Sequence, residues 1–297
     1  MTAAPVAGSS LALAASAATG VLVGVALVLT RAVIEQTTPS EVAFLRYLIG
    51  VLFLLPLLAR RPWVSLRRGD LLPILLLGIG QFAVLIVLLN YAVSKIEAGQ
   101  AALIFATFPL ITMALAVALG QEPFTLRRLL GIALTILGVG LSIGGAALAG
   151  QLSQGQWLGA GAAFLSAISG AICSVLYRPY LRRYPTLQIG SLAMLAAAVS
   201  LGLLLLPQGF FASWPSFTPG GWWAVIGIGL TSGVGYLLWL YALNRVWASN
   251  VAAFMGLSPL TAAALGALFL GEPLTLADGA GLVCLLAGLG LALWRAG

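Results

Sequence analysis

The sequence contains no histidine, and lysine occurs once, at Lys95. A Ser-His hydrolase and an HExxH metalloprotease both need histidine, so neither kind of active site can be assembled from this chain. The two cysteines, Cys173 and Cys284, each lie inside an apolar run, where a disulfide framework is not expected. These absences argue against an enzyme, and we expect no cofactor and no metal site.

Charged side chains are also scarce. They make up 7% of the chain, against 61% hydrophobic residues and a mean hydropathy of +1.10. So little polar surface cannot cover a water-soluble globule, so we expect an integral membrane protein in contact with lipid. The net charge of +7 resides in short segments between apolar runs, where membrane orientation explains it. No basic patch is interleaved with aromatic residues, and we expect no nucleic-acid partner.

Carboxylates are missing from the middle of every apolar run. The seven acidic residues all fall near predicted helix ends: Glu35, Glu41, Asp70, Glu97, Glu122, Glu272 and Asp278. A charge at the centre of a membrane helix costs about 2.5 to 3.5 kcal/mol on insertion scales. A proton relay or a sodium site built on a buried carboxylate therefore lacks its usual material.

Ten apolar runs are long enough to cross a bilayer, which takes a helix of about 20 residues. They occupy residues 11–34, 41–59, 71–94, 98–119, 126–149, 157–177, 187–206, 222–244, 249–270 and 275–294. The connecting segments are short and leave no room for a soluble second domain. The first ten residues carry no lysine or arginine, so we expect a retained first helix rather than a cleaved signal peptide.

Arginine gathers in alternate connecting segments. If the N-terminus is cytoplasmic, the cytoplasmic segments hold Arg60, Arg61, Arg67, Arg68, Arg127, Arg128, Arg178, Arg182, Arg183, Arg245 and Arg295. The opposite side holds only Arg31 and Lys95, while Arg46 lies inside the second run. Cytoplasmic loops of membrane proteins carry an excess of basic residues, so we expect both termini to be cytoplasmic.

The stretch from Tyr91 to Leu141 is repeated from Tyr241 to Leu291, at a constant offset of about 150 residues. The aligned residues include Tyr91 and Tyr241, Pro109 and Pro259, Glu122-Pro123 and Glu272-Pro273, and Gly131, Gly138 and Gly140 with Gly281, Gly288 and Gly290. Apolar composition alone would scatter matches among leucine and alanine. Because proline, glutamate and glycine keep register, we infer an internal duplication.

The duplication predicts how the halves lie in the membrane. Each copy contains five helices, an odd number, so the second copy must cross the membrane in the opposite direction. The predicted fold is therefore all-α integral membrane, with ten transmembrane helices as two inverted five-helix repeats, residues 1–150 and residues 151–297, in one transmembrane domain. Inverted repeats recur in transporters, where a small-molecule substrate binds near the midplane. A non-transporting membrane scaffold is the alternative.

Each half carries a proline inside its fourth helix and a Gly-Glu-Pro-like signature just after it. The signatures are Gly120-Gln121-Glu122-Pro123, with Gln121 inserted, and Gly271-Glu272-Pro273. In these features the chain resembles the EamA-type members of the drug/metabolite transporter superfamily, and within it looks most like amino-acid exporters of the YddG kind. The resemblance implies export of neutral, including aromatic, amino acids or related small metabolites across a bacterial cell inner membrane. The missing buried carboxylates predict uniport or exchange. Export of another metabolite or a drug with proton coupling is the alternative.

Pro109 and Pro259 are expected near the centres of the fourth and ninth helices. A proline there removes a backbone donor and clashes with the preceding turn, so each helix should bend. The carbonyls of Phe105 and Met255, four residues earlier, would then be available to a substrate ammonium. We hypothesise that both prolines are gating hinges of alternating access; a static kink is the alternative.

Polar side chains at mid-depth tend to face the bundle interior, because hydrocarbon penalises them. Gln81, near the middle of the third helix, is the strongest candidate for a substrate-binding group. The other candidates are Phe82, Ser16, Thr19, Phe105, Thr107, Ser166, Ser169, Thr231, Tyr236, Trp239 and Ser258. Each hydroxyl could instead bond to its own helix, each ring could pack in the core or against lipid, and Gln81 could bridge two helices. Arg46 either meets a substrate carboxylate, or snorkels, or pairs with Glu41 or Glu35.

The fifth and tenth helices are rich in glycine and have almost no polar group at mid-depth. Gly131, Gly138, Gly140, Gly144 and Gly145 lie in the fifth, and Gly279, Gly281, Gly288 and Gly290 in the tenth. Small residues let helix backbones approach closely. We therefore expect these helices to serve as a scaffold or as the contact of a homodimer.

Overall fold

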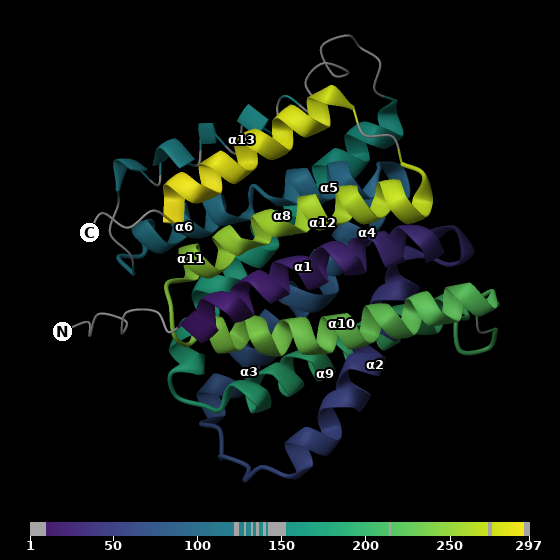
Figure 1. The fold of residues 1–297 in the computed structure, drawn as a ribbon. Helices are drawn as coiled ribbons and strands as arrows, with labels where there is room; N and C mark the ends of the chain where they lie inside the picture. The colour runs from purple at the N-terminus through teal and green to yellow at the C-terminus, as the bar shows by residue number, and fades with distance from the viewer. Residues whose placement is uncertain are drawn as a thin grey trace.

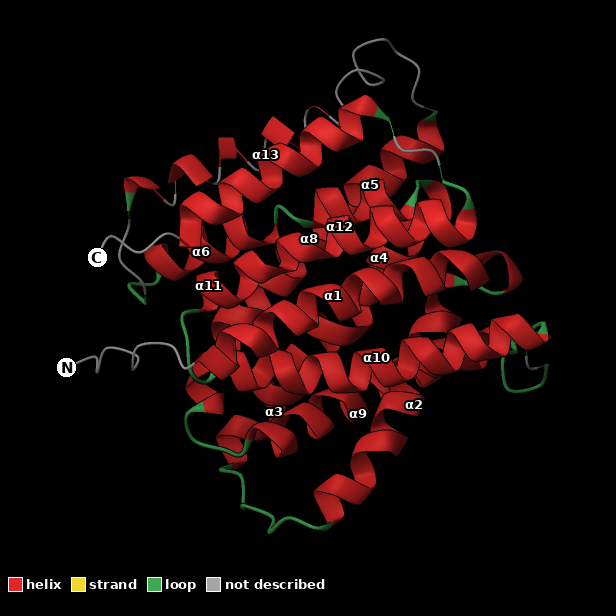
Figure 2. Cartoon of the chain, in the orientation of Figure 1, coloured by secondary structure: helices red, strands yellow, loops and turns green. Residues whose placement is uncertain are grey.

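The computed structural model describes residues 10–121, 125–127, 129–131, 133–134, 137–138, 141, 153–213, 215–272 and 275–293. Within these residues every regular element is helical, and no strand occurs (Figure 2). The first half contains α1 (Ser10–Val33), η1 (Ile34–Gln36), α2 (Pro39–Ala59), α3 (Arg68–Gly78), η2 (Ile79–Val84), α4 (Leu85–Lys95), α5 (Ala98–Phe105) and α6 (Phe108–Ala118). The second contains α8 (Gln154–Leu181), α9 (Thr186–Leu205), η3 (Leu206–Gln208), α10 (Pro219–Leu243), α11 (Ala248–Ala253), η4 (Phe254–Gly256), α12 (Leu257–Leu265), η5 (Gly266–Leu270) and α13 (Leu276–Leu293).

Eight helical segments of the described chain are long and apolar enough to cross a membrane. They span Ser10–Gln36, Pro39–Ala59, Arg68–Lys95, Ala98–Ala118, Gln154–Leu181, Thr186–Gln208, Pro219–Leu243 and Asn250–Leu270. Each coincides with one of the predicted runs, although 157–177 is too short by several residues at each end. The predicted run 126–149 lies in large part outside the described residues, and the run 275–294 corresponds to α13.

The helices pack side by side in one bundle (Figure 1). α1 packs against α10 and α12, α4 packs against α8, and α2 packs against α9 and α10. Helices of the two halves thus alternate in contact rather than forming separate domains. α1 begins and α13 ends at the same end of the bundle, on the left of Figure 1.

Side-chain caps set where several helices begin. At α2, Thr38 Oγ1 accepts from the Glu41 N–H at 3.3 Å, and Glu41 Oε2 accepts from the Thr38 N–H at 2.8 Å. Ser153 and Gln156 form the same reciprocal capping box at α8. These pairs satisfy N–H groups that the first turn leaves without a helical partner. Local hydrogen bonds therefore help to fix where α2 and α8 begin after the breaks between apolar runs.

The duplication is visible as matched local structure. The Lys95 ammonium lies over the Tyr91 ring at 5.7 Å, and the Arg245 guanidinium lies over the Tyr241 ring at 3.7 Å. Both pairs stand at the last turn before a short link, at the same position of each copy. The predicted fourth helix (98–119) and ninth helix (249–270) are also interrupted at equivalent points. The first is interrupted between α5 and α6, and the second at η4.

The inserted Gln121 has a structural counterpart in the second copy. Gly120 and Gly271 are both left-handed, with φ of +65° and +66°, although they stand one residue out of register with the repeat. The π-helical segment η5, Gly266–Leu270, directly precedes Gly271. A π bulge holds one more residue than an α-helical turn. The extra residue in η5 therefore balances the insertion of Gln121, and the sequences of the two copies are again aligned at Glu122 and Glu272. The signature residues Glu122, Pro123 and Pro273 lie outside the described residues.

The fourth and ninth helices pack in opposite directions. α5, the first piece of helix four, contacts α12, the last piece of helix nine, and α6 contacts α11.

Close packing also joins helix five to α13. A Cβ added at Gly138 would meet the Gly281 carbonyl oxygen at 2.5 Å, and one at Gly281 would meet the Gly138 oxygen at 2.7 Å. These two glycines therefore serve a contact within the chain.

Candidate functional site

A cavity of about 110 Å³ lies between the two halves. Its wall comes from α1, α2, η2, α4, α5, α6, α10 and η4. The lining residues are Thr19, Leu22, Val23, Ala26, Leu27, Arg46, Tyr47, Gln81, Phe82, Leu85, Ile86, Leu89, Phe105, Phe108, Thr231, Ser232, Gly235, Tyr236, Trp239 and Met255. An apolar cavity with a few polar groups is the usual form of a small-molecule site.

Aromatic rings form two continuous parts of the wall. Tyr47, Phe82 and Tyr236 follow one another edge to face, with ring centroids 4.9 Å and then 4.1 Å apart. Phe108 stacks on Phe105 at 5.5 Å and tilts against Trp239 at 5.5 Å. These contacts bring α2, η2, α5 and α6 of the first half against α10 of the second. The rings therefore join the halves as well as lining the cavity.

Gln81 lies on η2, the π-helical segment between α3 and α4. Its Oε1 is buried and has no hydrogen-bond partner among the described residues. A π bulge shifts the direction of side chains relative to a regular helix, and such bulges are frequent at functional sites. An unpaired carbonyl oxygen in a low-dielectric wall is costly unless a ligand supplies a donor.

Seven of the twelve predicted binding residues line the cavity: Gln81, Phe82, Phe105, Thr19, Thr231, Tyr236 and Trp239. The other five are absent from the lining: Ser16, Thr107, Ser166, Ser169 and Ser258. Ser16, Thr107 and Ser166 donate to carbonyls of their own helical segments, at 2.7 to 2.8 Å. Ser169 donates to the Gly80 carbonyl at 2.8 Å and so joins α8 to η2. Ser258 is fully buried at the start of α12.

Pro109 and Pro259 both stand directly after helix breaks. Pro109 is the second residue of α6, and Pro259 is the third residue of α12. α1 approaches the second break closely, because a Cβ at Gly20 would collide with the Phe254 carbonyl oxygen. The breaks thus adjoin the cavity, which Phe105 and Met255 line directly.

Several lining residues were not among the predicted binding set: Arg46, Tyr47, Phe108, Ser232 and Met255. Arg46 is 4% exposed and donates from Nη2 to Thr30 Oγ1 at 2.9 Å. It does not snorkel. Among the described carboxylates none pairs with it, so the expected partners Glu41 and Glu35 are not used. A lone arginine inside an apolar run was the available signal for this part of the wall.

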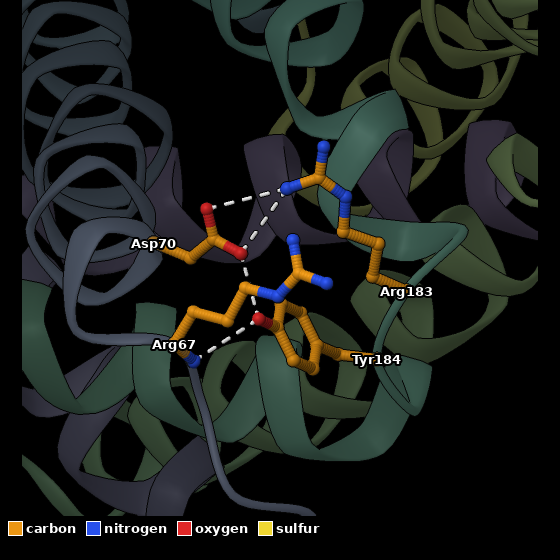
Figure 3. Close-up of polar contacts among 4 residues, drawn as sticks. All are labelled: Arg67, Asp70, Arg183 and Tyr184. Atoms are coloured by element: carbon orange, nitrogen blue, oxygen red, sulfur yellow. Dashed lines mark hydrogen bonds and ion pairs between the residues drawn. The ribbon is translucent and has the colours of Figure 1, made fainter.

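Polar contacts tie the halves together at both ends of the bundle. Asp70 accepts from Arg183 Nη1 at 3.2 and 3.3 Å and from the Tyr184 hydroxyl at 2.6 Å (Figure 3). The Tyr184 oxygen in turn accepts from the Arg67 N–H at 3.2 Å. We call Arg67, Asp70, Arg183 and Tyr184 the Asp70 cluster. It joins the start of α3 to the link between α8 and α9.

A second connection lies where α1 ends. Arg31 Nε is 3.7 Å from Glu272 Oε1, and the same oxygen accepts from the Ala98 N–H at 3.2 Å. We call Arg31, Ala98 and Glu272 the Glu272 cluster. α2 begins near it and runs through 21 residues, about 30 Å, before the segment that leads to Asp70. The two clusters therefore stand at opposite ends of the bundle.

The fold defines a multi-pass α-helical membrane protein with a cavity between its halves. The model of the EamA-like transporter family matches residues 9–144 and 157–294. The chain belongs to this family. It is a membrane transporter rather than an enzyme, with a small-molecule substrate and contacts to membrane lipid.

Individual proteins resemble the chain over most of its length. A protein of Streptantibioticus cattleyicolor named "Probable terminal-alkyne amino-acid exporter" is 31% identical, over 76% of this chain and 73% of its own. An "Uncharacterized transporter" of Archaeoglobus fulgidus is 26% identical, over 88% of this chain and 92% of its own. A solved crystal structure has a TM-score of 0.75 at 20% identity and covers 96% of this chain and 99% of that chain. That last likeness concerns the fold alone.

Proposed function

We propose that the protein exports neutral amino acids, including aromatic ones, or related small metabolites. The observation that carries the proposal is the cavity, whose wall combines stacked aromatic rings with a few polar groups. Aromatic walls suit apolar and aromatic side chains, while Gln81 and Arg46 offer polar contacts. The relative named as an amino-acid exporter supports the same substrate class. It also supports the likeness to exporters of the YddG kind.

The proposed architecture is ten transmembrane helices in two inverted five-helix repeats, residues 1–150 and residues 151–297. Two observations support it. The antiparallel contact of helices four and nine is the arrangement that inversion gives to equivalent helices. The contact of α1 with α10 also has its equivalent in that of α8 with α4, as a two-fold relation between the halves requires.

The proposed mechanism is alternating access around the cavity. The Asp70 and Glu272 clusters hold the halves together at opposite ends, and each must open in turn to let substrate pass. Pro109 and Pro259 supply the hinges, because each follows a helix break beside the cavity. Closing and opening then bends helices four and nine without unpacking their outer turns.

We propose that the protein works by uniport or exchange, and that the concentration gradient of the solute drives transport. The residues that line the cavity include no carboxylate, which a proton or sodium site in the membrane normally uses. Export of another metabolite or a drug with proton coupling would need a titratable group near the substrate. That alternative is the outcome to expect if transport follows an imposed proton gradient.

We place the protein in a bacterial cell inner membrane with both termini cytoplasmic. The distribution of arginine supports this orientation, since the Asp70 cluster and its neighbouring Arg60, Arg61 and Arg68 would face the cytoplasm.

We also propose a homodimer through helices five and ten. Exposed apolar side chains on α13 support that contact, with Leu276 96% and Val283 66% exposed.

The substrate class is tested by counterflow into proteoliposomes that contain the purified protein. Labelled L-phenylalanine, L-leucine, a sugar phosphate and a lipophilic cation would be compared at equal concentration. The proposal expects uptake of the amino acids alone. Uptake of the sugar phosphate or the cation without either amino acid would contradict it.

A further inference from the structure

Arg46 is a buried cation with no anionic partner among the residues that the structure describes. Its side chain enters the cavity wall from α2 and is 4% exposed. Thr30 Oγ1, which accepts from Nη2 at 2.9 Å, donates its own proton to the Ala26 carbonyl at 2.7 Å. Tyr47, the next residue of α2, also lines this part of the wall. Both neighbours are neutral and supply no compensating charge.

The nearest acidic residue in the sequence is already engaged. Glu41, five residues before Arg46, accepts from Thr37 Oγ1 at 2.6 Å and from the Thr38 N–H at 2.8 Å. No carboxylate among the described residues forms an ion pair with Arg46. Burying a cation without a counter-ion is unfavourable, and a purely structural role would normally include one.

Three polar atoms in this wall have no hydrogen-bond partner among the described residues, and one of them is the Tyr236 hydroxyl oxygen. Arg46 Nε is a buried donor, and Gln81 Oε1 is a buried acceptor. An arginine fork binds a carboxylate through two parallel N–H bonds. A carbonyl oxygen accepts from an ammonium. The wall is thus complementary to a molecule that carries both groups.

We propose that Arg46 is the carboxylate anchor of the substrate and that Gln81 Oε1 accepts its ammonium. This inference rests on the proposed amino-acid export and adds the polar groups that recognise the backbone of the amino acid. Arg46 is the only charged residue among those that line the described cavity. A single guanidinium matches a monoanionic carboxylate, whereas a phosphate dianion would call for further cations. The aromatic rings are left to contact the side chain.

The test uses the purified full-length protein and three related probes. L-phenylalanine carries both groups, L-phenylalaninamide lacks the carboxylate, and 3-phenylpropanoate lacks the ammonium. Binding is measured as ligand-dependent thermal stabilisation and, in proteoliposomes, as competition with labelled L-phenylalanine. The wild type should bind L-phenylalanine at least about tenfold more tightly than either analogue, because each analogue leaves a buried group unpaired.

The variants separate recognition from folding. Arg46→Gln should lose the preference for L-phenylalanine over its amide, and Arg46→Lys should keep part of it. Without ligand, Arg46→Gln should melt no lower than the wild type, because it removes an uncompensated buried charge. Gln81→Leu should lose the preference for L-phenylalanine over 3-phenylpropanoate.

Arg178 provides a matched control, because it is also buried but does not line the cavity. It donates to the Val246 carbonyl at 3.4 Å and lies over the Trp247 ring at 5.2 Å. Arg178→Gln should keep the preference for the acid over the amide. If Arg46→Gln keeps that preference while amino acids are still transported, the anchor is wrong and the proposed function stands. If the wild type binds none of the probes and transports no amino acid, both fail.

Discussion

Phe82 and Tyr236 meet edge to face across the two halves of the transporter, with ring centroids 4.1 Å apart. Phe82 belongs to the π-helical segment that also carries Gln81, and Tyr236 belongs to α10. The contact therefore couples the position of η2 to the opposite half. It also closes one wall of the cavity.

Phe82→Ala should alter which amino acids are transported. The substitution removes an aromatic contact worth about 0.5 to 1.5 kcal/mol beyond its buried area and enlarges the cavity. We expect transport of L-leucine to fall several-fold relative to L-tryptophan, measured by counterflow. Phe44 is the control, because it does not line the cavity. Its ring meets that of Phe210 edge to face, with ring centroids 5.5 Å apart. Phe44→Ala should leave the ratio unchanged; an equal shift in both variants would contradict the assignment.

Pro109→Ala and Pro259→Ala should slow transport while substrate binding stays near that of the wild type. Alanine restores the backbone donor and removes the ring clash, which favours a continuous helix by up to about 3 kcal/mol. Rates would be measured by efflux, and binding by thermal stabilisation. Pro56, an exposed proline inside α2, provides the control substitution Pro56→Ala. Unchanged rates in both hinge variants would remove the hinge proposal.

Asp70→Asn should favour the state that is open at the Asp70 cluster. The variant removes the charge that faces Arg183 and weakens the acceptor of the Tyr184 hydroxyl. The contact is partly exposed, so we expect the population of the two states to shift by no more than about fivefold. Alkylation of a cysteine introduced at Leu66 would report it. An unchanged alkylation rate would show that the cluster does not limit opening at this end.

Gly281→Ala should lower the thermal denaturation midpoint, because its Cβ would collide with the Gly138 backbone. Gly279, on the same helix, has open space around it, so Gly279→Ala should leave the midpoint unchanged.

The proposed homodimer is tested by Gly279→Trp, which should lower the mass of the detergent-solubilised particle without changing the thermal denaturation midpoint. A constant mass would argue against a dimer through this face of α13.

The membrane spans could be predicted from the sequence because they depend on length and hydropathy alone. Eight predicted runs coincide with described spans, and the caps at Thr38 and Ser153 explain two of the boundaries. The duplication predicted where helices four and nine are interrupted, since Pro109 and Pro259 keep register. The extra residue at Gln121 could be seen in the sequence, but the π bulge that balances it in the second copy could not.

The cavity was harder to predict because these helices are apolar on all sides. Periodicity therefore does not tell which face of a membrane helix points inward. Ser16 and Ser166 were predicted to bind substrate, yet each hydroxyl is satisfied by a carbonyl of its own helix. Phe108 has no polar group that distinguishes it from lipid-facing rings, and Tyr47 was not among the predicted residues. Gln81 was identified because an amide at mid-depth is costly unless it faces a partner.

The central claim is that the cavity at Gln81 carries an amino acid down its own gradient. The most direct test is efflux of a panel of labelled amino acids from proteoliposomes without any ion gradient, comparing the wild type with Gln81→Ala. We predict selective efflux of one or a few neutral amino acids, reduced at least about tenfold in the variant. Efflux that appears only when a proton or sodium gradient is imposed, or that is equal in the variant, would contradict the claim.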